Sequence, residues 1–123
     1  MTLHEITSML GAVLLSGTDD LDIIVEQAYC ADLMSDVLYC SVSNSLLITH
    51  LTNAQVIRTA HIADLKAVVF CEDKKPDAVT INLAEKKGIP LLLTGLSMFD
   101  ACGLLYEKGL RGCLILKTND LEY

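Results

Sequence analysis

The chain has 123 residues, 52% of them hydrophobic, and its sixteen acidic and nine basic residues give a net charge of -7. This length fits one compact domain, so we expect residues 1–123 to form a single domain. The negative charge argues against nucleic acid as a partner, and the sequence lacks the roughly 18 consecutive apolar residues that cross a membrane.

The N-terminal residues predict a helix followed by a strand. Residues 2–12 place apolar side chains at helical spacing, and Thr2 with Glu5 has the spacing of a capping box. Gly11 can end this helix, because glycine readily adopts the left-handed conformation that follows a last helical turn. A short strand is expected over residues 12–15.

The next part of the chain is less regular. A turn at 17–20 precedes residues 23–29, whose alternation predicts a strand at an edge of the sheet. In the stretch CADLMSDVLYC (30–40), Asp32 or Ser35 can accept hydrogen bonds from the first N–H groups of a helix. The alternatives are a binding or interface role, or a metal site, for which two aspartates supply too few ligands.

The C-terminal two-thirds alternates between strand and helix. Short aliphatic segments, typical of strands covered on both faces, occur at residues 45–50, 67–72, 89–94 and 112–117. Segments with apolar residues at helical spacing lie between them, at residues 54–64, 77–88 and 97–109. This alternation predicts the α/β class, with a mainly parallel sheet and right-handed crossovers.

Capping residues bound these three helices. Gly88 and Gly109 follow last turns that contain lysine, as is common at helix ends. Within the second helix we expect Val79, Leu83 and Ala84 to share one face. The predicted N-terminal caps, from the first helix to the third, are Thr52 or Asn53, then Asp77, then Ser97.

A ligand site is expected where the strands end. In an open α/β sheet, ligands bind outside the carboxyl ends of the strands, and helix N-termini there offer free N–H groups. Each polar residue in these loops also has a simpler explanation as a cap, a turn residue or a solvated charge. The predicted ligand-binding residues are His50, Thr52, Asn53, Glu72, Asp73, Thr94 and Ser97.

No catalytic residue, metal ligand or cofactor is predicted. The sequence contains none of the phosphate-binding, dinucleotide-binding, zinc-protease or serine-hydrolase motifs. His50 is the residue from which a catalytic argument would start, because it follows a strand and histidine titrates near neutral pH. An enzyme that uses His50 with a carboxylate such as Asp73 is therefore the alternative to a binding protein.

The helix predicted at 97–109 carries apolar side chains on more than one face, which core packing alone or a subunit interface would explain. Gly103 within it costs roughly 1 kcal/mol relative to alanine, so we expect a close backbone approach there. The high hydrophobic content also favours a homo-oligomer, most simply a dimer. The predicted interface residues are Met98, Phe99, Cys102 and Tyr106.

The five cysteines have no C-x-x-C spacing, and the N-terminus has no secretory signal pattern. Reduced, mostly buried thiols and a cytoplasmic location are therefore expected. Cys30 and Cys40, at the ends of a strand and a helix, are possible partners in a redox pair. Nothing in the sequence lowers the pKa of either thiol.

The order of three segments, residues 28–38, 45–70 and 84–110, resembles a small DRTGG-domain protein, a family similar to the N-terminal domain of HPr kinase/phosphorylase. The resemblance covers residues 3–112. It implies a three-layer α/β/α sandwich that acts as a regulatory or ligand-sensing module and is often oligomeric. The nucleotide-using half of HPr kinase would be missing, so kinase activity is not expected.

The sequence departs from the name-giving motif of that family. Thr52-Asn53-Ala54 takes the place of Gly-Asp-Arg, and Cys71-Glu72-Asp73 takes the place of Thr-Gly-Gly. In the family motif, a glycine pair lets a ligand approach the backbone, and an arginine clamps phosphate. This sequence has neither the glycine pair nor the arginine at these positions. Arg58, one turn into the helix, is a partial substitute for the arginine.

Together these observations predict a non-catalytic regulatory or ligand-sensing domain that acts as a homo-oligomer. It would bind a small ligand or a partner protein at the strand-end loops. Two alternatives stay open at this point. One is the enzyme that uses His50, and the other is an accessory subunit that docks on a larger enzyme.

Overall fold

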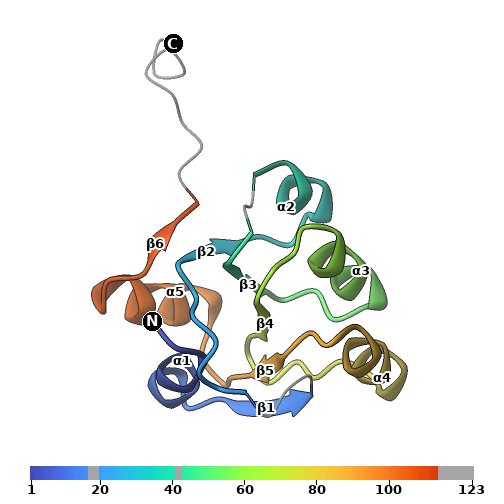
Figure 1. Cartoon of the computed structure of the whole chain (residues 1–123). Coiled ribbons are helices and arrows are strands. Elements are labelled where there is room, and N and C mark those ends of the chain that lie inside the picture. Colours follow the sequence, from blue (N-terminus) through green and yellow to red (C-terminus); the bar gives the residue numbers. More distant parts are fainter. Residues whose placement is uncertain (17–19, 41–42, 114–123) are drawn as a thin grey trace.

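A computed structural model describes residues 1–16, 20–40 and 43–113 of the chain (Figure 1). The helices are α1 (Leu3–Leu10), α2 (Met34–Cys40), α3 (Ala54–Ile62), α4 (Ala78–Lys87) and α5 (Met98–Glu107). The strands are β1 (Val13–Ser16), β2 (Gln27–Cys30), β3 (Ser45–Thr49), β4 (Ala67–Phe70), β5 (Leu91–Leu93) and β6 (Arg111–Gly112). None of the helices in this part of the chain could span a membrane.

The strands form a six-stranded sheet in the order β1-β5-β4-β3-β2-β6. The pairs β2–β3, β3–β4, β4–β5 and β2–β6 are parallel, and β1 pairs with β5 in the antiparallel direction. The predicted α/β fold with a mainly parallel sheet is therefore confirmed.

The placement of β2 at a sheet edge was wrong, because β6 pairs with its outer side. The sequence showed the periodicity of β2 but not which strand would pair with it. The predicted strand 112–117 begins at Arg111, and its residues 114–117 lie outside the described residues, as do residues 17–19 of the predicted turn.

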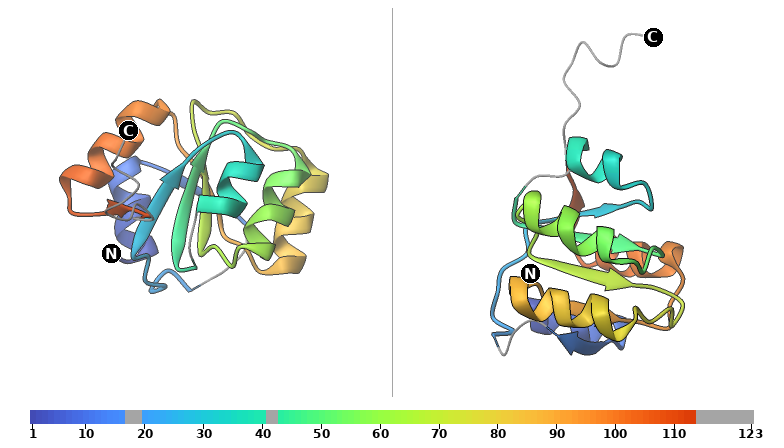
Figure 2. Two further views of the ribbon diagram at one scale, coloured as in Figure 1. Left: turned by 90° about the horizontal axis from the view of Figure 1, so that it is seen from above. Right: turned by 90° about the vertical axis from the view of Figure 1, so that its right-hand side faces the viewer.

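Helices cover both faces of the sheet (Figure 2). Along β3, Leu46 and Ile48 pack in a core with α1 and α5, whereas Leu47 packs in a second core with α2, α3 and α4. Successive side chains of a strand point to opposite faces, so a strand covered on both sides is apolar throughout. The alternation in β4, where Val69 and Phe70 belong to opposite cores, repeats this arrangement. The three-layer α/β/α sandwich is thus confirmed.

The predicted caps of α1, α3, α4 and α5 are present. Thr2 and Glu5 form a capping box on α1, and Gly11 ends that helix in the left-handed conformation. Asn53, Asp77 and Ser97 cap the N-termini of α3, α4 and α5 through their side chains. These contacts fix where each helix leaves its loop, and two of them, at Asn53 and Ser97, lie in the loops predicted to bind a ligand.

The predicted packing face of α4 was partly wrong. Val79 is 72% exposed, while Thr80 and Ala84 are buried against the core. Thr80 and Ala84 are four residues apart and therefore lie on one side of the helix. The sequence favoured Val79 because it is more apolar than Thr80, but the helix turns the small side chains toward the sheet.

Candidate ligand site at the strand ends

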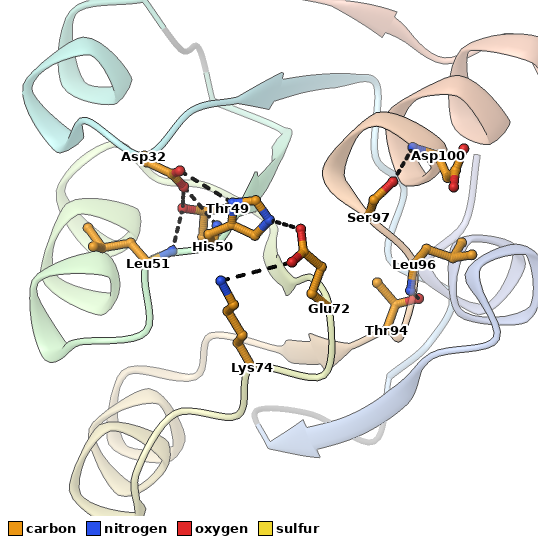
Figure 3. A network of polar contacts seen from close by, with 10 residues as sticks. All are labelled: Asp32, Thr49, His50, Leu51, Glu72, Lys74, Thr94, Leu96, Ser97 and Asp100. Atoms are coloured by element: carbon orange, nitrogen blue, oxygen red, sulfur yellow. Dashed lines mark hydrogen bonds and ion pairs between the residues drawn. The ribbon is translucent and has the colours of Figure 1, made fainter.

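The polar residues of the candidate site follow three neighbouring parallel strands. Asp32 comes after β2, His50 directly after β3, and Glu72 shortly after β4. Because β2, β3 and β4 are adjacent and parallel, their carboxyl ends lie at the same edge of the sheet. Three residues separated by 18 to 40 positions in the sequence are thereby brought together (Figure 3).

His50 is held between two carboxylates (Figure 3). Its Nε2 lies 2.5 Å from Oε2 of Glu72, and its Nδ1 lies 3.5 Å from Oδ2 of Asp32. The other oxygen of Glu72 is 3.9 Å from Nζ of Lys74. The side chain of His50 is 29% exposed, so the ring is fixed by its partners and still reaches solvent.

Asp32 is tied to the end of β3. Its Oδ1 accepts hydrogen bonds from the hydroxyl of Thr49, at 2.8 Å, and from the backbone N–H of His50, at 2.7 Å. Partial burial raises the pKa of Asp32, but these two hydrogen bonds and the His50 ring outweigh it, so the pKa lies below its ordinary value. The carboxylate that was considered as a cap for the following helix thus contacts the neighbouring strand instead.

Glu72 and Asp73 have an unusual backbone. Both are in the left-handed region, with φ of 58° and 56°. Their N–H groups donate to the carbonyls of Leu96, at 2.9 Å, and Thr94, at 3.0 Å, so the β4–α4 and β5–α5 loops are joined. This conformation costs roughly 1–2 kcal/mol per non-glycine residue, and these are the positions compared above with the glycine pair of the DRTGG motif.

The remaining predicted site residues have structural contacts. Asn53 and Ser97 accept hydrogen bonds from the first turns of α3 and α5, each at 3.0 Å. Thr94 is buried, and its hydroxyl donates to the carbonyl of Leu10 at 2.7 Å. The carboxylate of Asp73 lies against Gly95, where an added Cβ would be 3.2 Å from Oδ2.

Thr52, the last of the seven predicted residues, is half-buried in the loop before α3. Among the seven predicted residues, His50 and Glu72 are the pair that the structure brings into side-chain contact. In Figure 3, Thr94 and Ser97 lie apart from the His50 group, in the loop between β5 and α5.

Sequence reasoning missed Asp32 and Thr49 as site residues. Asp32 was read as a helix cap, and Thr49 as part of the buried strand predicted at 45–50. A signal was available, because a polar residue after the strand at 23–29 would reach the same edge as His50 if that strand were parallel to its neighbour. The sequence alone did not show whether that strand runs parallel to its neighbour.

The arrangement offers hydrogen-bonding groups and charge to a ligand. Within residues 1–16, 20–40 and 43–113, no group of three His, Cys, Asp or Glu side chains is placed to hold a metal. His50 offers a polarised ring nitrogen, Glu72 an acceptor, and Lys74 a positive charge. A histidine paired with a carboxylate can also accept a proton from a substrate, which is the chemistry of the enzyme alternative.

The predicted interface residues divide into two groups. Phe99 is 86% exposed and Tyr106 is 60% exposed on α5. Met98 and Cys102 are half-buried and pack against the core of their own chain. The guanidinium of Arg111 lies 4.0 Å from the centre of the Tyr106 ring and covers one of its faces.

No protein-family model matches the sequence, and no curated protein sequence matches it. Among solved structures, the fold is similar to the CBS and DRTGG domains of the regulatory region of Clostridium perfringens pyrophosphatase, in a complex with its activator diadenosine tetraphosphate. The TM-score is 0.73 at 16% sequence identity, and the match covers 85% of this chain and 45% of that chain. The present chain therefore spans less than half of that structure.

At this identity the similarity is one of fold. It supports the resemblance to DRTGG domains at the level of the architecture. It does not bear on the similarity to HPr kinase/phosphorylase.

Proposed function

We propose that the chain is a regulatory domain of the DRTGG type that binds a small ligand at its strand-end site and has no catalytic activity of its own. The observation that carries the proposal is the His50 ring, held between Asp32 and Glu72 at the carboxyl edge of a parallel sheet. Ligands of open α/β folds bind at this edge. The fold similarity to a regulatory region with a bound nucleotide activator supports the same class of function.

The contacts of Glu72 indicate which part of a ligand would bind. Its carboxylate lies between the ring of His50 and the ammonium group of Lys74. An anionic group of a ligand, such as a phosphate, fits the same position between two donors. Glu72 would then act as an internal competitor that leaves the site when the ligand enters, while Asp32 continues to orient His50 through Nδ1.

Ligand-linked stabilisation tests this proposal. The chain is heated alone and with ATP, diadenosine tetraphosphate or small phosphorylated metabolites, with and without Mg²⁺. A ligand at one hundred times its Kd stabilises the folded state by about 2.7 kcal/mol, which shifts Tm measurably. We expect one of these compounds to raise Tm in the natural chain and not in His50→Ala.

Matched variants separate the site from general effects. His61→Ala removes an exposed histidine of α3 and should keep the full response. Glu72→Gln removes the competing charge and should bind the anionic compound more tightly than the natural chain does. Stabilisation that is equal in the natural chain and in His50→Ala, or weaker binding in Glu72→Gln, would contradict the proposed site.

The enzyme alternative is favoured by one observation, the contact between His50 and Glu72 at a solvent-exposed edge. It exchanges the predicted partner Asp73 for Glu72, since Asp73 lies against Gly95. Turnover of any of the screened compounds that disappears in His50→Ala would establish this alternative and overturn the non-catalytic one.

The homo-oligomer, the single-domain organisation and the cytoplasmic location belong to the same proposal. The oligomer is supported by Phe99 and Tyr106, large apolar side chains that α5 exposes to solvent. The location is supported by free thiols at Cys30, Cys71, Cys102 and Cys113. A partner protein in place of a small ligand would be bound by the same strand-end loops.

A further inference from the structure

A second site lies on the α5 side of the sheet, beside the strand-end site. A pocket of about 130 Å³ opens between β2, β6 and α5, and its lining is mostly apolar. Cys30 and Cys102 both line it, together with Ile48, Tyr106 and Arg111. Two thiols thus share one small, solvent-accessible pocket that the proposed ligand site does not use.

The backbone explains why the two thiols meet. Cys30 is the last residue of β2 and pairs with Ile48 of β3 in the parallel register. Paired residues of adjacent strands point to the same face of a sheet, and Ile48 packs in the core with α1 and α5. Cys30 therefore lies on the α5 side of the sheet, where Cys102 packs against the same core, lines the same pocket and is in hydrogen-bond contact with Cys30.

The environment makes the two thiols unequal. The hydrogen bond from Cys30 lowers the pKa of Cys102, although partial burial opposes the shift. Donating this bond raises the pKa of Cys30, and burial and the electrostatic influence of Cys102, Cys71 and Asp32 add to the increase. Cys102 is thus the nucleophile of the pair. Cys30, the more exposed of the two, is the thiol that then attacks the oxidised sulfur of Cys102.

We propose that Cys30 and Cys102 form a reversible redox pair, oxidised to an intramolecular disulfide by hydrogen peroxide or an organic hydroperoxide. The proposal is independent of the strand-end ligand site. It replaces the pair Cys30–Cys40 considered from the sequence by a pair that the structure brings into contact.

The reaction balances in two steps. The thiolate of Cys102 attacks one oxygen of hydrogen peroxide, the O–O bond breaks, and the departing hydroxide takes up a proton to become water. Cys102 is then a sulfenic acid. The sulfur of Cys30 attacks the sulfur of Cys102, the S–O bond breaks, and hydroxide leaves with the proton of Cys30 as a second water.

The disulfide would join the end of β2 to the middle of α5. Asp32, which orients His50, is only two residues beyond Cys30. Oxidation would therefore fix the chain next to the strand-end site. Reduction by a dithiol would release it, as with other exposed disulfides.

Intact-mass spectrometry and peptide mapping test the proposal. The full chain is reduced, freed of reductant and treated with increasing hydrogen peroxide. We expect a mass loss of two hydrogen atoms and a cross-linked peptide that contains Cys30 and Cys102, both reversed by dithiothreitol. A disulfide that maps to other cysteines, one that links two chains, or no mass loss before over-oxidation would overturn the proposal.

Single variants identify the roles of the two thiols. In Cys30→Ser, dimedone should label Cys102, because the sulfenic acid has no thiol to resolve it. In Cys102→Ser, labelling at Cys30 should be weaker than labelling at Cys102 in Cys30→Ser, because burial and the nearby carboxylate of Asp32 still raise the pKa of Cys30. Equal labelling of the two cysteines would overturn the assignment of Cys102 as the nucleophile.

Control variants exclude other pairings and loss of the fold. Cys113→Ser removes a half-buried thiol whose contacts are with Ser45 and Ala28, so it should keep the disulfide. Cys40→Ser should also keep it. Unchanged circular dichroism shows that each variant is folded, and loss of the disulfide in a folded Cys40→Ser would contradict the proposed pair.

Discussion

Two consecutive residues in the candidate site, Glu72 and Asp73, adopt a conformation that glycine adopts without strain. Asp73 can be tested without disturbing His50, because the histidine contacts Glu72 and Asp32 instead. We expect Asp73→Gly to be more stable than Asp73→Ala by about 1 kcal/mol, since both variants lack the carboxylate but only alanine keeps the strained Cβ.

Urea unfolding of the two variants measures this difference. The comparison cancels the loss of any contact made by the Asp73 carboxylate, including the one with Gly95. Equal stabilities would mean that the left-handed backbone at position 73 carries no strain. In that case the departure from the glycine pair has no energetic cost at this residue.

The carboxylate of Asp32 predicts a pH dependence of stability. Because its pKa is lowered in the folded state, its contribution is complete above the unfolded pKa of about 3.9 and is lost as pH falls through the folded value. We expect Asp32→Asn to be less stable by about 1 kcal/mol at pH 7, a value reduced from that of a buried charged hydrogen bond because the carboxylate is half-exposed.

The difference between Asp32→Asn and the natural chain should shrink as the pH is lowered from 5 to 3. Asp22→Asn, at an exposed position, is the matched control and should leave the acid limb unchanged. A constant difference over this range would show that Asp32 acts through its shape and not through its charge.

At the scale of single residues, the sequence was informative about residues at the ends of predicted strands. His50 and Glu72 were predicted because polar residues after parallel strands gather at one edge. Asp32 was assigned to a local cap because local hydrogen bonds can be proposed without knowing the strand order. Cys30 and Cys102, far apart in the sequence, meet only once β2 and α5 are placed.

At the scale of elements, Gly103 in α5 gives the next prediction. A Cβ added at Gly103 meets no atom within 4 Å, so the close approach expected from the sequence is not made inside the chain. We expect Gly103→Ala to stabilise the chain by about 1 kcal/mol, the helix propensity gained in a helix interior. Thermal and urea unfolding at low protein concentration measure it.

Gly109 is the control for this substitution. An added Cβ there also meets nothing within 4 Å, but φ is 109°, a conformation that alanine adopts only with strain. Gly109→Ala should therefore destabilise the chain. If both variants changed stability in the same direction, helix propensity would not explain the effect at Gly103.

The elements themselves were largely predictable, because their signals are local. Capping residues such as Asn53 and Ser97 begin their helices as expected, and the aliphatic runs at β3 and β4 form buried strands. The place of β2 was not predictable, because strand order depends on long-range pairing with the short strand β6. Val79 shows the same limit for a helix, since its exposure depends on how α4 is rotated against the sheet.

At the scale of the whole molecule, the two cores occupy opposite faces of the sheet, and different helices cover them (Figure 2). On α5, Phe99, Gly103 and Tyr106 lie on one side of the helix, at spacings of four and three residues. Two large apolar side chains flanking a glycine form a ridge that a second α5 can approach closely. A two-fold axis would place the same ridge on both sides of the contact.

This ridge predicts how single charges change the oligomeric state. We expect the natural chain to be a dimer at micromolar concentration by size-exclusion chromatography with light scattering, and Phe99→Asp to have the monomer mass of 13.4 kDa. Val79→Asp is the matched control, because Val79 is 72% exposed on α4, a helix on the other face of the sheet, and receives the same charge. It should keep the dimer.

A monomeric natural chain would contradict the dimer, and the exposed side chains of α5 would then be available to a different protein, as the accessory-subunit alternative requires. Loss of the dimer in both variants would mean that added negative charge, on a chain that already carries -7, separates the subunits without regard to the ridge.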